Sequence, residues 1–481
     1  MNAELKDVKK VIPITPVASE AEPELVSLYA AHEKIYPRSV TGVFTNWRWI
    51  MVWVTQIIFY GLPWVEWGQR QAVLFDLEVR RFYIFGLVLY PQDFIYLTGM
   101  LIISALSLFL FTAVAGRLWC GYACPQTVYT EIFLWIEKLT EGDRSARMRR
   151  DGGAMTAEKF GRKTAKHLIW LLFGLWTGFT FVGYFTPIQT MVSQVSTLDF
   201  GPWETFWVLF YGFATYGNAG FMREQVCKHM CPYARFQSVM FDKDTLIVTY
   251  DAERGEPRGA RSKKADPTKL NLGACVDCSL CVQVCPTGID IRNGLQYECI
   301  GCGACADVCD TVMDKVGYPR GLVKYSTENA MTNKWTQKQT LRHVFRPRIL
   351  VYTSILMVIV LATLVSLATR TPFKVDVVRD RGVMARIVEA GKTENVYRLQ
   401  VMNATETDQR YRFSVAGLPG LVLTSEDTVS VRSTEARTVP MRVQLPFEGA
   451  PGGSHEIQIV IESLDSPGKL VEKTTFLVPK Q

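Results

Sequence analysis

Long uncharged apolar runs dominate the hydrophobic pattern of the chain before residue 370. Most of them reach the roughly 20 residues that a helix needs to cross a bilayer core of about 30 Å. They are Trp49–Val65, Phe94–Ala115, Leu168–Thr186, Thr205–Met222 and Ile349–Ala368. The pattern therefore predicts about five transmembrane α-helices. The first run is interrupted by Gly61 and Pro63, and the fourth carries Asn218 near its end, so a buried core helix is the alternative for these two.

Basic residues are distributed unevenly between the loops. Ten Lys or Arg separate the second and third runs, whereas the loop Pro187–Glu204 has none. By the positive-inside rule the first loop is cytoplasmic and the second is outside. Alternation then predicts an internal N-terminus, an internal region 223–348, and an external region after Ala368. Arg70, Arg80 and Arg81 in the first external loop oppose this orientation but are outnumbered.

Three other segments of the first half are too short or too polar to span. The N-terminal tail, residues 1–46, is polar and punctuated by proline, and it shows no cleavable signal peptide, so we expect a partly disordered tail before an uncleaved anchor. Phe82–Tyr90 is expected to lie at the outer interface. Pro125–Leu139 predicts an amphipathic helix along the inner interface, with Pro125 at the first helical position.

The pattern changes to strict alternation after the last apolar run. Examples are Tyr397–Val401, Arg412–Val415 and Glu456–Ile461, separated by Gly, Pro, Asn and Asp at intervals near ten residues. Alternation with regular turn signals is typical of a small all-β sandwich. The region contains no cysteine, so it would fold without disulfides.

Length and charge agree with several units in a membrane-bound chain. At 481 residues the chain is too long for one compact core, and its net charge of +7 is explained by membrane orientation. The basic run Arg254–Lys264 is interleaved with Gly and Pro, which favours a solvated linker over a nucleic-acid surface. The expected divisions are a tail (1–46), a four-helix region (47–222), a cysteine-rich region (223–348), a last helix (349–368) and the sandwich (369–481).

Twelve cysteines all precede the last helix, and the predicted topology places them in the reducing cytoplasm, where metal binding is favoured over disulfides. Eight form the runs Cys275-x2-Cys278-x2-Cys281-x3-Cys285-Pro and Cys299-x2-Cys302-x2-Cys305-x3-Cys309-Asp, within about 266–315. In bacterial ferredoxins each such run gives three thiolates to one 4Fe–4S cluster and the fourth to the other. The predicted ligand sets are Cys275, Cys278, Cys281 and Cys309 for one cluster, and Cys299, Cys302, Cys305 and Cys285 for the second.

A zinc ribbon is the alternative for paired cysteines. The tripled spacing, repeated twice, favours iron–sulfur clusters that conduct single electrons. Asp310 stands where the second run would carry proline, without removing a ligand.

The other four cysteines form a repeated CxxxCP motif. Cys120 and Cys124 follow the second predicted helix, and Cys227 and Cys231 follow the fourth. Soft thiolates favour Cu(I), zinc or iron–sulfur chemistry, and His229 and Met230 add two further candidate copper ligands. Small packing cysteines or a transient redox pair are the alternatives.

Common electron-carrier sites are missing from the sequence. None of the five histidines lies in a predicted spanning segment, which excludes a haem held by paired membrane histidines of this chain, and no GxGxxG or Walker loop is present. The electron donor is then a protein or a membrane quinol.

Several motifs resemble a known family. They are Lys34-Ile-Tyr-Pro-Arg38, Arg81-Phe-Tyr-Ile-Phe85, Gly116-Arg-Leu-Trp-Cys-Gly-Tyr-Ala-Cys-Pro-Gln126, Cys231-Pro-Tyr-Ala-Arg-Phe-Gln237 and Lys315-Val-Gly-Tyr-Pro-Arg-Gly321. The chain resembles the CcoG family of cytochrome c oxidase accessory proteins, also called FixG or RdxA, which are bacterial polyferredoxins of the inner membrane. The CxxxCP pairs are also shared with quinol-dehydrogenase membrane ferredoxins.

The resemblance implies a periplasmic part with an immunoglobulin-like fold. It also implies a role in assembling a cbb-type oxidase, in which Cu(II) is reduced to Cu(I) before delivery to copper chaperones or assembly factors.

Three functional hypotheses follow. The first is a metalloreductase with copper as substrate, in which Cys120, Cys124, Cys227 and Cys231 bind or reduce the ion beside two 4Fe–4S clusters. The second is a quinol-oxidising conduit whose CxxxCP region lines a quinone pocket. The third is a non-enzymatic scaffold whose clusters sense redox state.

Overall fold

The computed structural model describes residues 34–197, 199–261, 270–380, 385–388, 391–446 and 449–479. Most of the predicted tail, residues 1–33, lies outside this set. The chain divides into a unit Met1–Ile35 and a unit Tyr36–Gln481, and the helices and strands of the described residues belong to the second.

The described part of the chain contains three helices that are long and apolar enough to cross a membrane: Pro91–Ala115, Ala157–Val182 and Pro347–Ala368. They comprise α2 (Phe94–Ala115) with the preceding turn η2 (Pro91–Asp93), α6 (Ala157–Val182) and α16 (Pro347–Ala368). The two interrupted runs are also helical but do not meet the same criterion. α1 (Val43–Gly61) ends at Gly61, where glycine interrupts the apolar run in the sequence, and is followed by the turn η1 (Leu62–Trp64). α8 (Pro202–Gly217) continues into the π-helix η3 (Asn218–Met222).

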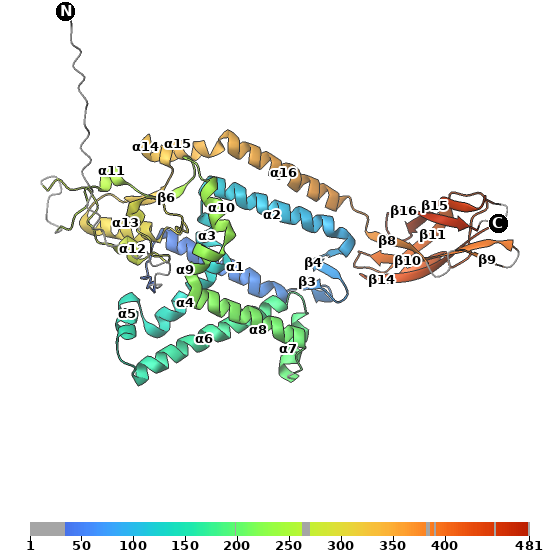
Figure 1. Cartoon of the computed structure of the whole chain (residues 1–481), viewed down its shortest axis with the longest axis horizontal. Coiled ribbons are helices and arrows are strands. Elements are labelled where there is room, and N and C mark those ends of the chain that lie inside the picture. The colour runs from blue at the N-terminus through green and yellow to red at the C-terminus, as the bar shows by residue number, and fades with distance from the viewer. Residues whose placement is uncertain are drawn as a thin grey trace, which may run out of the picture. The chain divides into compact units, whose positions relative to one another are not determined.

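The long helices pack in pairs. α2 and α16 run side by side (Figure 1). The Tyr96 hydroxyl of α2 donates to the Ser366 carbonyl of α16 at 3.1 Å. α6 and α8 approach through glycines: a Cβ added at Gly178 would lie 2.2 Å from the Val208 carbonyl oxygen. Glycine at such positions lets helix backbones pack closely in a membrane.

Short helices and turns connect these long ones. They are α3 (Leu118–Tyr122), α4 (Pro125–Glu141), α5 (Arg144–Gly152), α7 (Ile188–Thr197), α9 (Arg223–Gln225), the π-helix η4 (Val226–Met230) and α10 (Pro232–Met240). α4 begins at Pro125, as the sequence predicts. It is more than a surface helix, because it buries the side chains of Glu137 and Glu141 almost completely.

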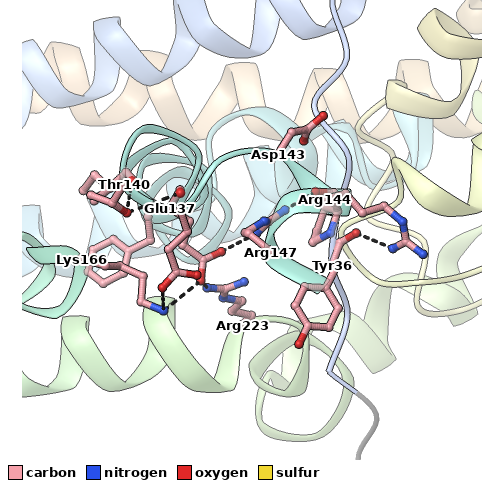
Figure 2. Close-up of polar contacts among 12 residues, drawn as sticks. Tyr36, Glu137, Thr140, Asp143, Arg144, Arg147, Lys166 and Arg223 are labelled. Atoms are coloured by element: carbon pink, nitrogen blue, oxygen red, sulfur yellow. Dashed lines mark hydrogen bonds and ion pairs between the residues drawn. The ribbon is translucent and has the colours of Figure 1, made fainter. Parts of the chain in front are cut away.

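An ion-pair network surrounds Glu137 (Figure 2). Its carboxylate lies 2.5 Å from Arg147 of α5 and 2.8 Å from Arg223 of α9, while Lys166 of α6 pairs with Glu141 at 3.0 Å. Burial opposes the charge of Glu137, but Arg223, Arg147 and Lys166 outweigh it and hold the pKa of the carboxyl below its ordinary value. Some of the basic residues that predict membrane orientation are thus paired inside the protein.

The cysteine-rich region contains little regular structure. Strand β6 (Ile247–Tyr250) pairs antiparallel with β7 (Val323–Ser326), and the cysteine runs lie between them. Its helices and turns are α11 (Ala252–Gly255), α12 (Leu280–Gln283), η5 (Ile291–Asn293), α13 (Ala304–Val316), α14 (Glu328–Thr332), α15 (Gln337–Arg342) and η6 (His343–Phe345). In the run expected to be a solvated linker, Arg254 donates to the Arg320 carbonyl at 3.1 Å and Arg261 to the Gly273 carbonyl at 2.7 Å. These two arginines therefore fasten the region together.

One residue of this region completes the first helix. The N-cap of α1 is Gly42, which has no side chain to satisfy the exposed amides. The buried carboxylate of Asp307 in α13 accepts from the Phe44 amide at 3.1 Å and from the Thr45 amide at 2.7 Å. A helix N-terminus is usually capped by the side chain of the residue just before it, whereas here the capping side chain comes from a distant segment.

The C-terminal region is a sandwich of two antiparallel sheets around one apolar core. One sheet has the order β12-β14-β10-β8, with β9 also paired to β10, and the other has the order β13-β11-β15-β16. The strands are β8 (Phe373–Arg379), β9 (Arg386–Ile387), β10 (Thr393–Asn403), β11 (Gln409–Ala416), β12 (Val422–Leu423), β13 (Thr428–Val431), β14 (Ala436–Leu445), β15 (Gly453–Ser463) and β16 (Lys469–Val478). All three alternating runs named from the sequence lie on strands, and their inward residues, such as Leu399, Phe413 and Ile459, are buried in the shared core.

A small sheet lies between α1 and α2 in sequence. The hairpin β1 (Glu66–Trp67) and β2 (Arg70–Gln71) precedes the three-stranded sheet β3 (Val73–Asp76), β4 (Arg81–Ile84) and β5 (Leu87–Leu89). The stretch Phe82–Tyr90 does not span, as predicted, but the sequence pattern missed its strands. The Tyr90 hydroxyl donates to the Asn403 carbonyl at 2.9 Å, and Lys374 pairs with Asp93 at 2.5 Å. This loop therefore contacts the sandwich.

Candidate iron–sulfur and thiol site

The second cysteine run surrounds a cavity together with the last cysteine of the first run. Gly303 is in the left-handed region (φ 73°), and it turns the chain into α13 so that Cys302 precedes the helix and Cys305 lies in its first turn. Cys285, just after α12, joins Cys299, Cys302 and Cys305 around this cavity. Burial raises the pKa of the Cys299 thiol to about 12, and the nearby thiols of Cys302 and Cys285 add to the effect.

The first run forms a second cavity with the last cysteine of the second run. Cys275, Cys278, Cys281 and Cys309 line it, and α13 carries Cys309 there from one helical turn beyond Cys305. Burial raises the pKa of Cys281 to about 11, and the guanidinium of Arg292 opposes this rise. The structure thus exchanges the fourth cysteine between the runs, which is the grouping that two ferredoxin-type clusters require.

The residues present fit two 4Fe–4S clusters. Each cavity is lined by the four cysteines of one predicted ligand set, and Cys281 reaches both cavities. Most of the other lining residues are apolar, and Arg292 is a charged exception in the second cavity. Soft thiolate sulfur is the preferred ligand of iron–sulfur centres. Because ligated thiols are deprotonated, binding at these sites would displace protons from thiols whose pKa burial has raised.

The four CxxxCP cysteines occupy equivalent places in two repeated turns. Cys124 is the N-cap of α4 and Cys231 that of α10, both with extended backbone and both followed by proline at the first helical position. Cys120 lies in α3 and Cys227 in the π-helix η4.

The structure brings these four thiols together. Burial raises the pKa of Cys227 to about 12, with further contributions from Cys124, Cys120 and Cys231. The Cys120 sulfur also contacts the side-chain amide of Gln237, on α10, at 3.4 Å. Among the described residues no three His, Cys, Asp or Glu side chains close around a single ion. The side chains of His229 and Met230 are exposed, whereas the four thiols are half-buried.

Backbone contact joins this thiol group to the second cysteine run. A Cβ added at Gly121, inside the first CxxxCP motif, would lie 2.9 Å from the Cα of Cys302 and from the carbonyl oxygens of Ile300 and Gly301. The buried guanidinium of Arg117 donates to the carbonyls of Tyr297 and Ala234. The first CxxxCP motif therefore contacts both the second cysteine run and the helix that follows the second CxxxCP motif.

Sequence reasoning missed Arg117 and Gln237 as members of the site. Both belong to the motifs that carry the family resemblance, since Arg117 precedes the first CxxxCP and Gln237 follows the second. Their roles depend on partners 117 residues or more away along the chain, so no local pattern indicates them.

Family models match three parts of the chain. Residues 222–328 match a 4Fe–4S dicluster domain, residues 97–141 match a 4Fe–4S binding domain, and residues 363–479 match the IG-like fold at the C-terminal of FixG. The second range includes Cys120 and Cys124. The third shows that the sandwich is an immunoglobulin-like domain of the FixG type.

The whole chain is similar to curated proteins of other bacteria. Protein RdxB of Cereibacter sphaeroides is 38% identical over 465 residues, which cover 94% of this chain and 97% of RdxB. Nitrogen fixation protein FixG of Rhizobium meliloti is 38% identical over 492 residues, with 94% of each chain covered. A crystal structure of a FixG-related protein from Vibrio parahaemolyticus aligns with 22% of this chain and 97% of its own, at 25% identity and a TM-score of 0.21.

Proposed function

Because this chain belongs to the FixG and RdxA family of iron–sulfur electron-transfer proteins, we propose that it reduces Cu(II) to Cu(I) at a membrane. The product would supply assembly of a cbb-type cytochrome c oxidase. Cys275, Cys278, Cys281 and Cys309 would hold one 4Fe–4S cluster, and Cys299, Cys302, Cys305 and Cys285 the other. Each cluster, when bound, accepts and donates one electron.

One observation carries this proposal: four half-buried thiols lie close to one another, and Gly121 between two of them packs on the backbone of the second cluster run. Cu(II) prefers nitrogen and oxygen ligands, whereas Cu(I) prefers sulfur. A set of thiolates therefore stabilises the reduced ion relative to the oxidised one. Cu(II) that reaches Cys120, Cys124, Cys227 and Cys231 would take up one electron and stay bound as Cu(I) until a chaperone or assembly factor removes it.

The proposed location is the bacterial inner membrane. α1 and α8 would complete a five-helix multi-pass arrangement, with the N-terminus and clusters cytoplasmic and the sandwich periplasmic. The contact between Tyr90 and Asn403 supports this, because it requires the α1–α2 loop and the sandwich to share a side. The basic loop before α6 favours the cytoplasm for the opposite side.

The test replaces all four CxxxCP cysteines by serine in the full-length protein, purified anaerobically. We expect formation of Cu(I), followed with a Cu(I)-specific chelator after reduction by dithionite and removal of excess reductant, to fall at least tenfold. The cluster EPR signals should persist, because the substituted residues are not the proposed cluster ligands. The matched control changes the two exposed residues of the second motif, His229→Ala and Met230→Leu, and should reduce copper normally. Unchanged copper reduction by the four-serine variant would refute the proposal.

A second candidate for the four thiols is a third 4Fe–4S cluster. It is favoured by the match of residues 97–141, which contain Cys120 and Cys124, to a 4Fe–4S binding domain. Iron and acid-labile sulfide analysis separates the candidates: two clusters give about eight iron atoms per chain and three give about twelve. A value near twelve that falls to eight in the four-serine variant would assign the thiols to iron.

A further inference from the structure

A large cavity beside α1 has no cysteine in its lining. It has a volume of about 660 Å³ and is lined by residues of α1, α4 and α6 together with the edge of the ferredoxin region. This volume is within the usual range of small-molecule sites, about 300–1,000 Å³. No cysteine lines it, so the functions assigned so far leave it unexplained.

The cavity follows one face of α1 and changes character along it. Arg48, Val52, Gln56 and Tyr60 all line it, and their spacing of four places them on one side of the helix over about 18 Å. At the Tyr60 end the walls are aromatic: the Tyr60 ring stacks near Trp176 of α6, with centroids 6.4 Å apart. At the Arg48 end the walls are charged, because Arg48 forms a buried ion pair with Glu131 of α4.

The polar end of the cavity adjoins the proposed cluster ligands. Val284 and Pro286, on either side of Cys285, line it, as does Ala304 next to Cys305. Ala304 also lines the cavity that Cys285, Cys299, Cys302 and Cys305 surround. A molecule bound at the Arg48 end would therefore be separated from the second cluster site by little more than one side chain.

We propose that this cavity binds a quinol, with its ring at the Arg48 and Glu131 end and its isoprenoid tail along the aromatic walls. The inference rests on the proposed function, because it names the source of the electrons. An occupant must be amphipathic, about as long as the α1 face, and able to enter between apolar helices, which a soluble protein donor cannot do. Two lining residues also carry a buried atom without a hydrogen-bond partner among the described residues, Nε of Arg48 and Oε1 of Gln56. Ring oxygens and hydroxyls would match that donor and that acceptor.

Quinol oxidation at this site has acceptors for both the electrons and the protons. Oxidation of the quinol to the quinone breaks two O–H bonds and releases two electrons and two protons. The clusters that the two cysteine groups would hold would accept the electrons, one each. The protons pass to the carboxylates that line the polar end, Glu131 and Asp143, and from there to solvent. This places the quinone site of the second sequence hypothesis at α1 instead of at the CxxxCP motifs.

The first experiment uses a photoreactive azidoquinone on the anaerobically purified full-length protein, with labelled peptides identified by mass spectrometry. Val52→Trp fills the cavity at a buried lining residue, whereas Val54→Trp makes the same change at an exposed residue of the same helix. We expect label on peptides of α1, α4 or α6 in the wild type, at least tenfold less in Val52→Trp, and no loss in Val54→Trp. Equal labelling of both variants, or label confined to other segments, would overturn the proposal. So would a phospholipid that copurifies with the protein and blocks the labelling even at excess quinone.

The second experiment measures reduction of the clusters by a short-chain quinol, followed by EPR. Val52→Trp should be at least tenfold slower than Val54→Trp, although dithionite reduces both fully, which shows that the clusters are intact. Glu131→Gln should keep the photolabel but slow quinol oxidation, because it retains the shape and loses the proton acceptor. Quinol-driven reduction at the wild-type rate in both variants would contradict the assignment.

Copper reduction and quinol oxidation can be tested independently of each other. Dithionite-reduced Val52→Trp should still reduce Cu(II), because the thiol group is untouched. If the reduced wild type leaves Cu(II) unchanged while quinol still reduces its clusters, the copper proposal falls and the quinol site stands.

Discussion

At the scale of single residues, Gly121 sets how closely the CxxxCP thiols approach the ferredoxin run. Three backbone atoms of Ile300, Gly301 and Cys302 lie 2.9 Å from the position of its missing Cβ, closer than real side chains come. None of these atoms is the flexible end of a side chain. The contact can therefore be kept only by glycine.

Gly121→Ala should force the two backbones apart. We expect a loss of about 1–3 kcal/mol from overpacking, seen as a lower thermal midpoint, together with slower copper reduction. Gly161→Ala is the matched control, because nothing lies within 4 Å of its added Cβ in helix α6, and there alanine should be neutral or slightly stabilising. Equal midpoints and rates in the two variants would show that the contact is looser than described.

At the scale of elements, α4 is connected to three other helices by ion pairs. Glu137 reaches Arg147 of α5, Arg223 of α9 and, at 3.8 Å, Lys166 of α6. Breaking a buried pair leaves unpaired charges in a poorly solvated place, which typically costs about 3–5 kcal/mol. The network therefore fixes the ends of these helices relative to one another.

This network predicts a pH dependence of stability. The folded-state pKa of Glu137 lies below its ordinary value of 4.5, so its contribution is complete above that value and is lost as pH falls through the folded pKa. Glu137→Gln should lower the thermal midpoint at pH 7 and approach the wild type in acid, measured from pH 3 to 7. Glu158→Gln removes an exposed pair with Arg162, and it should change the free energy of unfolding by no more than about 1 kcal/mol at any pH. If the thermal midpoints of wild type and Glu137→Gln differed by the same amount at every pH, the charge of Glu137 would not be the source of the stability.

The elements that could be read from sequence are those with a local pattern. Alternation identifies β10, β11 and β15, uncharged length identifies α2, α6 and α16, and proline marks the start of α4. The spacing of the cysteines similarly predicts the two sets of four thiols, each with its fourth member from the other run. The cap that Asp307 gives to α1 and the arginine contacts of Arg117 join segments more than 100 residues apart, and a single sequence carries no period that reports them. The strands of Phe82–Tyr90 were missed because a continuous apolar stretch has no alternation.

At the scale of the whole molecule, two regions gain their order in different ways. The sandwich buries side chains such as Tyr397, Tyr411 and Phe476 in one apolar core. In the ferredoxin region the core itself includes cysteines, among them Cys275 and Cys309. Because thiols stand there among the apolar side chains, the order of this segment depends on what the thiols bind.

Removal of iron by anaerobic chelation should therefore loosen one region and spare the other. We expect limited proteolysis to cut within residues 270–316 while a fragment containing residues 373–478 persists, because the sandwich holds no cysteine. Mass spectrometry of the fragments checks this. Cleavage in both regions at the same rate, or in neither, would contradict it.

The carboxylate of Asp307 has a consequence for biogenesis. The ribosome makes Thr45 long before Asp307, which is 262 residues later, so the first helix forms before the carboxylate that caps its leading amides exists. It reaches its final state only after the iron-binding segment has been translated and folded. We expect a cell short of iron to show the defect first at the opposite end of the polypeptide, as an unfinished first helix exposed to membrane proteases.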